Sequence, residues 1–346
     1  MAKPRKLIVP ATGDPTLHLI SRCVRRARLI GGADDELGPL HHRQFWIENR
    51  LVQLTQWFGV EGLTYAIMDN HFHLVVTMRR SWVESWSDET VVRRWVEVFP
   101  PKRFLGANGE QAKEVFIQNA LKAPQKIAEF RRRLGDCGWL MKALKEPISR
   151  QANKEDEAKG AFWDARYKSI HLADEGAILA CMAYVDLNPL RAGKAKTVEA
   201  QTQVGIEQRI KEAQSKQTEN KRKFTEWRDA QEKLRLDAAE DEGRKAQFKP
   251  VAFMRERSWL RPMDSAEKGG ENAFFKGRPL TLEAYISLLE FTAQKKKDGK
   301  ASMKPELAGA LERLGMANPE ETLERLWWQM GGKTGSKRPC LHLTAA

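Results

Sequence analysis

Two histidines, His71 and His73, flank a phenylalanine in the run HFHLVVTM, and their spacing points directly to chemistry. The run is rich in β-forming residues and predicts a strand, on which side chains two apart project from the same face. Two neutral imidazoles on one face can ligate a divalent ion together, although such pairs also occur in ordinary strands. A third histidine, His18, is interpreted as a strand residue, and as a fourth ligand or proton carrier only if it faces that metal.

Tyr184 and Asn188 form the second candidate pair, four residues apart near the end of a predicted helix and therefore on one face of it. A tyrosine hydroxyl can attack phosphorus and form a covalent phosphotyrosine when a metal neutralises the phosphate. The amide oxygen of Asn188 is a candidate third ligand for a hard ion such as Mg²⁺ or Mn²⁺. The structural alternative is a buried tyrosine followed by an asparagine that caps the helix before Pro189.

The elements that must position these residues follow from the spacing of apolar side chains. The pattern predicts a strand over 17–24, a helix over 42–58, a hairpin of two strands over 63–69 and 71–78, and a helix over 175–187. Asp174 is a candidate N-cap for the second helix, and proline at 189 ends it. This order predicts a ferredoxin-like α+β sandwich, an antiparallel sheet with helices on one face.

The chain is expected to divide into a main domain and appendages. Residues 1–200 form the predicted main domain, with a polar, Trp-rich helical insertion at about 79–157 that the pair Pro100-Pro101 breaks. Residues 201–246 are densely charged and nearly free of Gly and Pro, which favours an exposed linker helix. Residues 247–346 show helical apolar spacing with glycine stops, so they predict a small helical C-terminal module.

The composition indicates a partner with negative charge. A formal net charge of +13 and a pI near 9.6 describe a surface that attracts a polyanion, most commonly nucleic acid. The four cysteines form no C-x-x-C pair, which argues against a zinc ribbon and against a secreted disulfide framework. No apolar run reaches the length of a membrane span. We therefore expect a soluble, cytoplasmic nucleic-acid-binding protein that does not bind membranes.

Basic side chains near the two candidate pairs are expected to grip backbone phosphates, the alternative for each being an ordinary solvated side chain. They are Arg22, Arg25, Arg26 and Arg28 after the first strand, Arg166 and Lys168 after Phe162-Trp163, and Arg191 after Pro189. The chain also has 11 tryptophans. Most of them are expected in the core, but an exposed aromatic face can stack an unpaired base.

Three stretches of the sequence resemble the REP-associated tyrosine transposases, relatives of the HUH single-tyrosine transposases: MDNHFHLVV at 68–76, GAFWDARYKS at 160–169 and YVDLNPLRAG at 184–193. The resemblance covers roughly residues 15–200. It implies the HUH nuclease fold and a bacterial, nucleoid-associated enzyme that cleaves single-stranded or hairpin DNA, leaving a 5′-phosphotyrosine and a free 3′-OH. His71, His73 and Asn188 would then hold Mg²⁺ or Mn²⁺, and Tyr184 would be the nucleophile.

The sequence departs from that family in ways that leave alternatives open. Insertion-sequence relatives usually have glutamine where Asn188 stands, and the segments at 79–157 and after 247 exceed a minimal transposase, which suggests a host-adopted enzyme rather than a self-mobile element. A catalytically idle DNA-binding protein of the same fold is a second hypothesis. A metal-dependent hydrolase is a third, but only Asp69 supplies a carboxylate near the histidines. A monomer and a homodimer are both compatible with the sequence.

Overall fold

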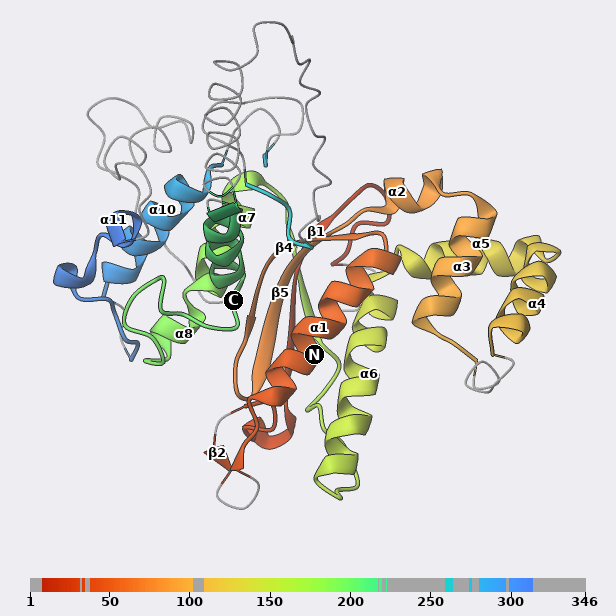
Figure 1. The fold of residues 1–346 in the computed structure, drawn as a ribbon, viewed down its shortest axis with the longest axis horizontal. Coiled ribbons are helices and arrows are strands. Elements are labelled where there is room, and N and C mark those ends of the chain that lie inside the picture. Colours follow the sequence, from red (N-terminus) through yellow and green to blue (C-terminus); the bar gives the residue numbers. More distant parts are fainter. Residues whose placement is uncertain are drawn as a thin grey trace, which may run out of the picture.

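A computed structural model shows a four-stranded antiparallel sheet between two helical layers (Figure 1). It describes residues 8–31, 33–34, 38–101, 109–216, 218–219, 222, 259–263, 274–275, 280–296 and 299–313. The strands lie in the order β4 (Val60–Ile67), β5 (His71–Met78), β1 (Thr16–Arg22) and β6 (Lys168–Leu172). The two middle strands, β5 and β1, come from distant parts of the chain. This strand order is that of a ferredoxin-like sandwich.

One face of the sheet packs on α1 (His42–Trp57) and α6 (Cys137–Glu155), which lie side by side (Figure 1). Alternate residues of the central strands, such as Leu19, Phe72 and Leu74, point into this core. Asp136 begins α6 because its carboxylate accepts hydrogen bonds from two backbone N–H groups in the first turn. The helix that completes the sandwich is therefore α6, at the end of the segment that the sequence analysis assigned to an insertion.

The rest of that segment forms a helical lobe beyond one end of the sheet (Figure 1). It contains α2 (Arg80–Ser85), α3 (Asp88–Val98), α4 (Gly109–Leu121) and α5 (Pro124–Leu134). Its centre is aromatic: the ring of Trp95 stacks on Phe130 at 4.7 Å and meets Trp139 of α6 at 5.5 Å. Trp95 and Trp139 therefore lie in an apolar core, as the sequence predicted for most tryptophans.

The other face of the sheet carries α7 (Glu175–Asp186), α8 (Asn188–Arg191) and α10 (Leu282–Gln294). A second apolar core joins this face to them, and it includes Val75 of β5, Met182 of α7 and Leu289 of α10. The predicted α+β class is thus confirmed, and the sheet carries helices on both faces instead of one. The reason is that this face also presents apolar side chains that must be covered, including Leu63 of β4, Val75 of β5 and Leu172 of β6.

Short elements complete the described part. They are η2 (Val24–Arg26), β2 (Ala33–Asp34), β3 (Gly38–Pro39), η4 (Pro305–Leu307) and α11 (Ala310–Arg313). The chain is also helical over 205–216, where the sequence predicted the start of a linker helix. The remainder of that predicted helix lies mostly outside the described residues.

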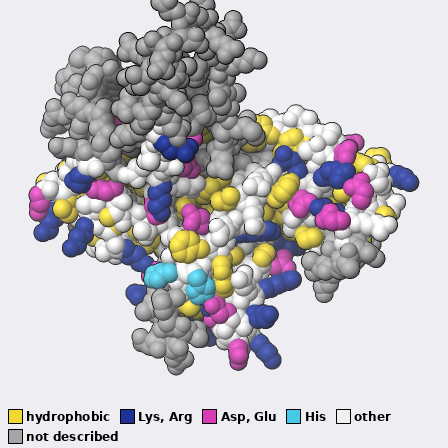
Figure 2. All heavy atoms as spheres, in the orientation of Figure 1, with side chains coloured by type: hydrophobic (Ala, Val, Ile, Leu, Met, Phe, Trp, Pro, Cys, Tyr) yellow, Lys and Arg dark blue, Asp and Glu magenta, His cyan; other side chains and the backbone are white. Residues whose placement is uncertain are grey.

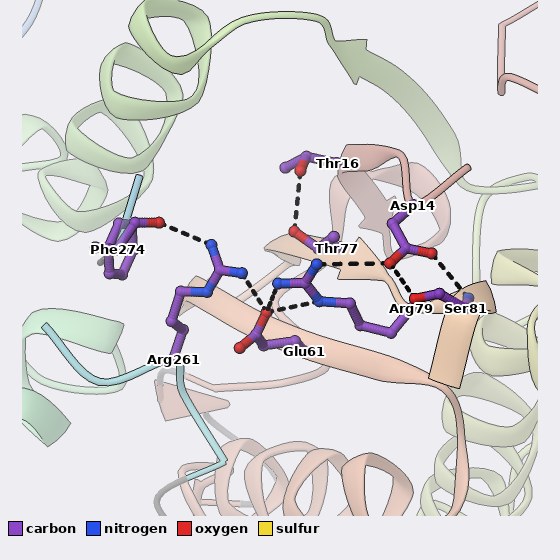
Figure 3. A network of polar contacts seen from close by, with 8 residues as sticks. All are labelled: Asp14, Thr16, Glu61, Thr77, Arg79, Ser81, Arg261 and Phe274. Carbon is purple, nitrogen blue, oxygen red and sulfur yellow. Dashed lines mark hydrogen bonds and ion pairs between the residues drawn. The ribbon is translucent and has the colours of Figure 1, made fainter. Parts of the chain in front are cut away.

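A network of ion pairs attaches a distant segment to the edge strand β4 (Figure 3). Glu61 of β4 pairs with Arg79, at the end of β5, and with Arg261 at 2.8 Å. The backbone N–H of Arg261 donates to the carbonyl of Gly62, and the ring of Trp259 packs on Tyr65 at 5.0 Å. Part of the region predicted as a separate C-terminal module is therefore packed on the main sheet.

Candidate metal and nucleophile site

The paired histidines lie at the start of β5 and project from the sheet face that carries α7. His71 and His73 are opposite Arg22 and Ile20 of β1, and their ring centroids are 5.0 Å apart. The strand begins directly after the Asp69-Asn70 turn, so His71 lies at the end of the sheet while His73 is one pair further in. His73 is only 3% exposed.

His18 of β1 joins this pair from the neighbouring strand. Its Nε2 lies 2.9 Å from Nδ1 of His73, the ring centroids are 5.1 Å apart, and the two ring planes are inclined by 24°. His18 is opposite Val75 and therefore on the same sheet face as both other histidines. The sequence interpretation of His18 as an ordinary strand residue missed this contact, because the two histidines are 55 residues apart in the chain.

Asn70 holds His71 in a similar way. Its amide nitrogen donates to the carbonyl of Arg26 at 3.0 Å, which directs its oxygen toward Nδ1 of His71 at 2.6 Å. An oxygen can only accept, so Nδ1 of His71 carries the proton of this hydrogen bond and Nε2 keeps its lone pair. A polar amide directly before the first histidine is the sequence signal for this contact.

Burial keeps all three imidazoles neutral. It lowers the pKa of His18 to about 4, and burial together with the charge of Arg22 lowers the pKa of His71 to about 4. The pKa of His73 falls well below its ordinary value, through burial first and then the neighbouring His18 and His71. A neutral imidazole is the form that binds a metal, so the electrostatics of the pocket suit ligation.

Tyr184 approaches the histidines from α7. Its ring meets that of His73 edge to face at 5.7 Å and that of His18 at 6.2 Å. The ring packs at the margin of the second apolar core and is partly exposed. Within the described residues its hydroxyl makes no hydrogen bond. The ring of Tyr184 therefore lies beside two imidazoles, and its hydroxyl has no partner among the described residues.

Asp186, two residues after Tyr184, fixes α7 to the sheet and to α10. Its buried carboxylate accepts hydrogen bonds from the Thr64 hydroxyl at 2.7 Å and the Ile206 backbone N–H at 2.9 Å. The hydroxyl of Tyr285 on α10 donates to the other carboxylate oxygen. Burial raises the pKa of Asp186 to about 6, although these hydrogen bonds oppose the shift. The helix that carries Tyr184 is thus fixed to β4 and to α10.

Asn188 begins α8, directly after the break that Leu187 introduces at the end of α7. Its backbone carbonyl accepts from Ala192, so the helical course continues past Pro189. In the described part of the chain its side chain makes no hydrogen bond, and it is partly exposed. The amide of Asn188 is chemically free to act as a ligand.

The residues present fit a divalent ion that has two nitrogen ligands. His71 uses Nδ1 toward Asn70 and His73 uses Nδ1 toward His18, which leaves Nε2 on each ring as the binding atom. Among the described residues no cluster of three His, Cys, Asp or Glu side chains is arranged to hold a metal. An ion held by the two histidines would need oxygen ligands of another kind, such as an amide, water or phosphate.

Several predicted basic residues gather at the same end of the sheet. Arg22 is directly opposite His71, and Lys168 of β6 is opposite Ile20 on the same face. Both are exposed, as are Arg25, Arg26, Arg28 and Arg166. Lys194 and Lys300, which the sequence analysis did not select, also lie near enough to His71 to lower its pKa. Asp69 pairs with Lys194 and opposes their effect on His71, but basic side chains outnumber this acidic residue at this end of the sheet.

Arg191 has another role. Its guanidinium donates to the carbonyls of Thr292 at 2.6 Å, Lys295 at 2.8 Å and Ala301 at 3.0 Å. These groups lie at and after the end of α10, so Arg191 caps that helix instead of facing open solvent.

On the face drawn in Figure 2, Lys and Arg side chains are spread among Asp and Glu without forming one continuous patch.

No family model matches the sequence, and no curated protein matches it. A similar solved structure is described as "Structure of the REP associates tyrosine transposase bound to a REP hairpin". It has a TM-score of 0.34 and 11% sequence identity, and the match covers 61% of this chain and 86% of that chain.

None of the helices in the described residues has the length and apolar content needed to cross a bilayer.

Proposed function

We propose that this protein nicks and rejoins single-stranded DNA through a covalent tyrosine intermediate. Tyr184 is the nucleophile, and His71, His73 and Asn188 are ligands of Mg²⁺ or Mn²⁺. The observation that carries the proposal is the contact of the Tyr184 ring with His73, at 5.7 Å, beside a second histidine. A nucleophile and a pair of metal-binding histidines that act on one phosphate must lie this close together.

The proposed reaction is a transesterification at phosphorus. The hydroxyl oxygen of Tyr184 loses its proton to solvent and forms a bond to phosphorus, while the bond from phosphorus to the 3′-oxygen breaks and that oxygen takes a proton from solvent to leave as a 3′-OH. The bound ion supplies neutralisation of the phosphate charge. The 5′-phosphotyrosine conserves the energy of the broken bond, so a 3′-OH can later attack it and free Tyr184. His18 and His73 are poor proton acceptors because burial lowers the pKa of each.

The substrate class follows from charge and from the resemblance of three motifs to REP-associated tyrosine transposases. Arg22 and Lys168 lie on the histidine face at the end of the sheet, where they can hold phosphates on either side of the scissile bond. Hairpin-forming or repeat DNA is the substrate that the resemblance implies. Strand transfer between such sites is the proposed outcome.

The test is a covalent trapping experiment. Wild-type protein is incubated with labelled single-stranded hairpin DNA and Mn²⁺, and a denaturing gel shows whether a protein-linked fragment forms. Tyr184→Phe removes only the hydroxyl, so we expect binding to survive while nicking and the adduct disappear. Tyr167→Phe is the matched control. Tyr167 contacts Cys137 away from the histidines, so this variant should still nick DNA and form the adduct.

Three results would contradict the proposal. One is an adduct that persists in the Tyr184→Phe variant. Another is a DNA-linked peptide that contains Tyr65, Tyr167 or Tyr285 in place of Tyr184. The third is wild-type protein that binds the DNA and forms no adduct with any divalent ion, which is the behaviour of a catalytically idle DNA-binding protein of this fold.

A further inference from the structure

We propose that His18 is a positioning residue for the metal site. The Nε2 of His18 accepts the Nδ1 proton of His73 and so fixes the ring of His73, which would ligate the metal through its own Nε2. The inference rests on the proposed function, because it assigns His18 a role toward the metal that His71 and His73 are proposed to hold. It makes His18 neither a ligand nor a nucleophile.

The contact between the two rings is short and shielded from water. Nε2 of His18 lies 2.9 Å from Nδ1 of His73, the two ring planes are inclined by only 24°, and the residues are 5% and 3% exposed. Within the described part of the chain neither ring makes another hydrogen bond. Each imidazole is therefore the partner on which the orientation of the other depends.

The tautomers follow from the chemistry of a neutral imidazole, which carries one proton on one of its two nitrogens. Two nitrogens 2.9 Å apart form a hydrogen bond only if one of them is protonated. If His73 binds a metal, its Nε2 must offer a lone pair, so its proton is on Nδ1. His18 then accepts through Nε2 and carries its own proton on Nδ1.

This arrangement excludes His18 as a direct ligand through Nε2. The lone pair that accepts the proton of His73 cannot also bind a metal. Asn70 provides an independent parallel, because its oxygen lies 2.6 Å from Nδ1 of His71 and directs Nε2 of that histidine in the same way. Each of the two proposed histidine ligands thus has an acceptor for its Nδ1 proton, a common pattern around metal-bound histidines.

Two variants separate the hydrogen bond from the shape of the ring. His18→Phe keeps an aromatic ring against His73 and Tyr184 but removes the acceptor, whereas His18→Gln offers an amide oxygen that can accept. Mn²⁺ binding is measured without DNA by titration calorimetry and by the loss of the free Mn²⁺ electron-paramagnetic signal. We expect His18→Phe to weaken Mn²⁺ binding by roughly 10- to 100-fold, and His18→Gln to recover a large part of the loss.

The result that overturns the proposal is Mn²⁺ affinity in His18→Phe equal to wild type, or an equal loss in both variants. His73→Ala serves to test the metal site itself: if it binds Mn²⁺ like wild type, the proposed function fails, and not merely the role of His18. Thermal unfolding in a chelator checks that each variant folds.

A measurement on unmodified protein keeps the proposal testable if the variants do not fold. Two-bond ¹⁵N–¹H correlation spectra of histidine-labelled, metal-free protein report which ring nitrogen carries the proton. We expect His73 to be protonated at Nδ1 and His18 to be unprotonated at Nε2. Protonation of His73 at Nε2 would overturn the assignment.

Discussion

Tyr184 is one of four tyrosines in the chain, and the surroundings of the four differ. The other three hydroxyls have partners inside the described structure: Tyr65 with Glu48, Tyr285 with Asp186, and Tyr167 with Cys137. Burial, followed by a neighbouring carboxylate, raises the pKa of Tyr65 and of Tyr285 well above the ordinary value. Tyr184 combines two imidazole neighbours with a hydroxyl that has no partner in the described part of the chain, so it is the tyrosine suited to attack a phosphate.

Asn188 is the proposed ligand with the least support from contacts, and it can be tested separately. We expect Asn188→Ala to lower Mn²⁺ affinity and adduct formation, because the amide oxygen is lost and no described side chain replaces it. Asn188→Gln should keep most of both, since glutamine occupies this position in the insertion-sequence relatives that the sequence resembles. The measurements are Mn²⁺ titration and the trapping gel. Equal behaviour of the alanine variant and wild type would remove Asn188 from the ligand set.

At the residue scale, spacing inside one element was enough to select the main candidates. His71 and His73 could be paired because residues two apart share a strand face, and Tyr184 could be selected from its motif near a helix end. His18 could not be assigned, because its contact with His73 depends on which strands are neighbours. Arg191 shows the opposite limit: its basic charge suggested DNA, but three distant carbonyls use its donors.

At the scale of elements, the sequence predicted the strands of the hairpin and the helices α1 and α7 closely, but it missed the role of α6. The β-rich runs and the Asp69-Asn70 turn are local signals, and they appear as β4 and β5. The role of α6 is not local: Leu140, Leu144 and Ile148 recur every four residues and mark a buried face, but this spacing does not show that the face packs on α1 and the main sheet. The polar stretch hid a helix of the main sandwich.

The attachment of α7 gives a prediction about pH. Burial raises the pKa of Asp186 to about 6 from an ordinary 3.8, so the folded state holds this proton more tightly than the unfolded state. The resulting stability is fully present below the unfolded pKa and is lost as the pH rises through about 6. Asp186→Asn removes the titration. We expect the free energy of unfolding of wild type, relative to this variant, to fall as the pH rises from about 4 to about 7.

Asp14 provides the matched control for that experiment. Burial opposes its ionisation, but hydrogen bonds from Ser81 and the charge of Arg79 lower the pKa of Asp14 on balance. Its contribution is present above the unfolded pKa and lost as the pH falls through the lower folded value, so Asp14→Asn should change the pH dependence in the opposite direction. Urea unfolding at several pH values measures both. A wild-type curve parallel to that of Asp186→Asn would contradict the buried, raised pKa.

At the scale of the whole molecule, composition predicted a partner but not a surface. The charge of +13 follows from 59 basic and 46 acidic side chains, yet many of the basic ones form ion pairs or bind carbonyls. The described residues after 259 pack on β4 and α7, so the sheet and part of the predicted C-terminal module share one core. The spacing of apolar residues in a single sequence predicts which side chains are buried, but it does not predict which domain they pack against.

The charge distribution leads to a prediction about DNA binding in salt. Binding of single-stranded DNA should weaken steeply as salt rises, because each neutralised phosphate releases condensed counterions, with a logarithmic slope of about 0.7 per contact. Arg22 lies opposite His71, and Arg25 and Arg26 follow it on the exposed exit of β1. Replacing any of these three with glutamine should lower affinity for all sequences similarly and reduce the slope by about one contact. Fluorescence anisotropy at several salt concentrations measures both quantities.

Arg191→Gln is the control for these variants. The donors of Arg191 are occupied by carbonyls at the end of α10, so we expect this variant to lower folding stability while leaving the salt slope unchanged. A slope unaffected by all three β1-exit variants would show that DNA is bound by another surface.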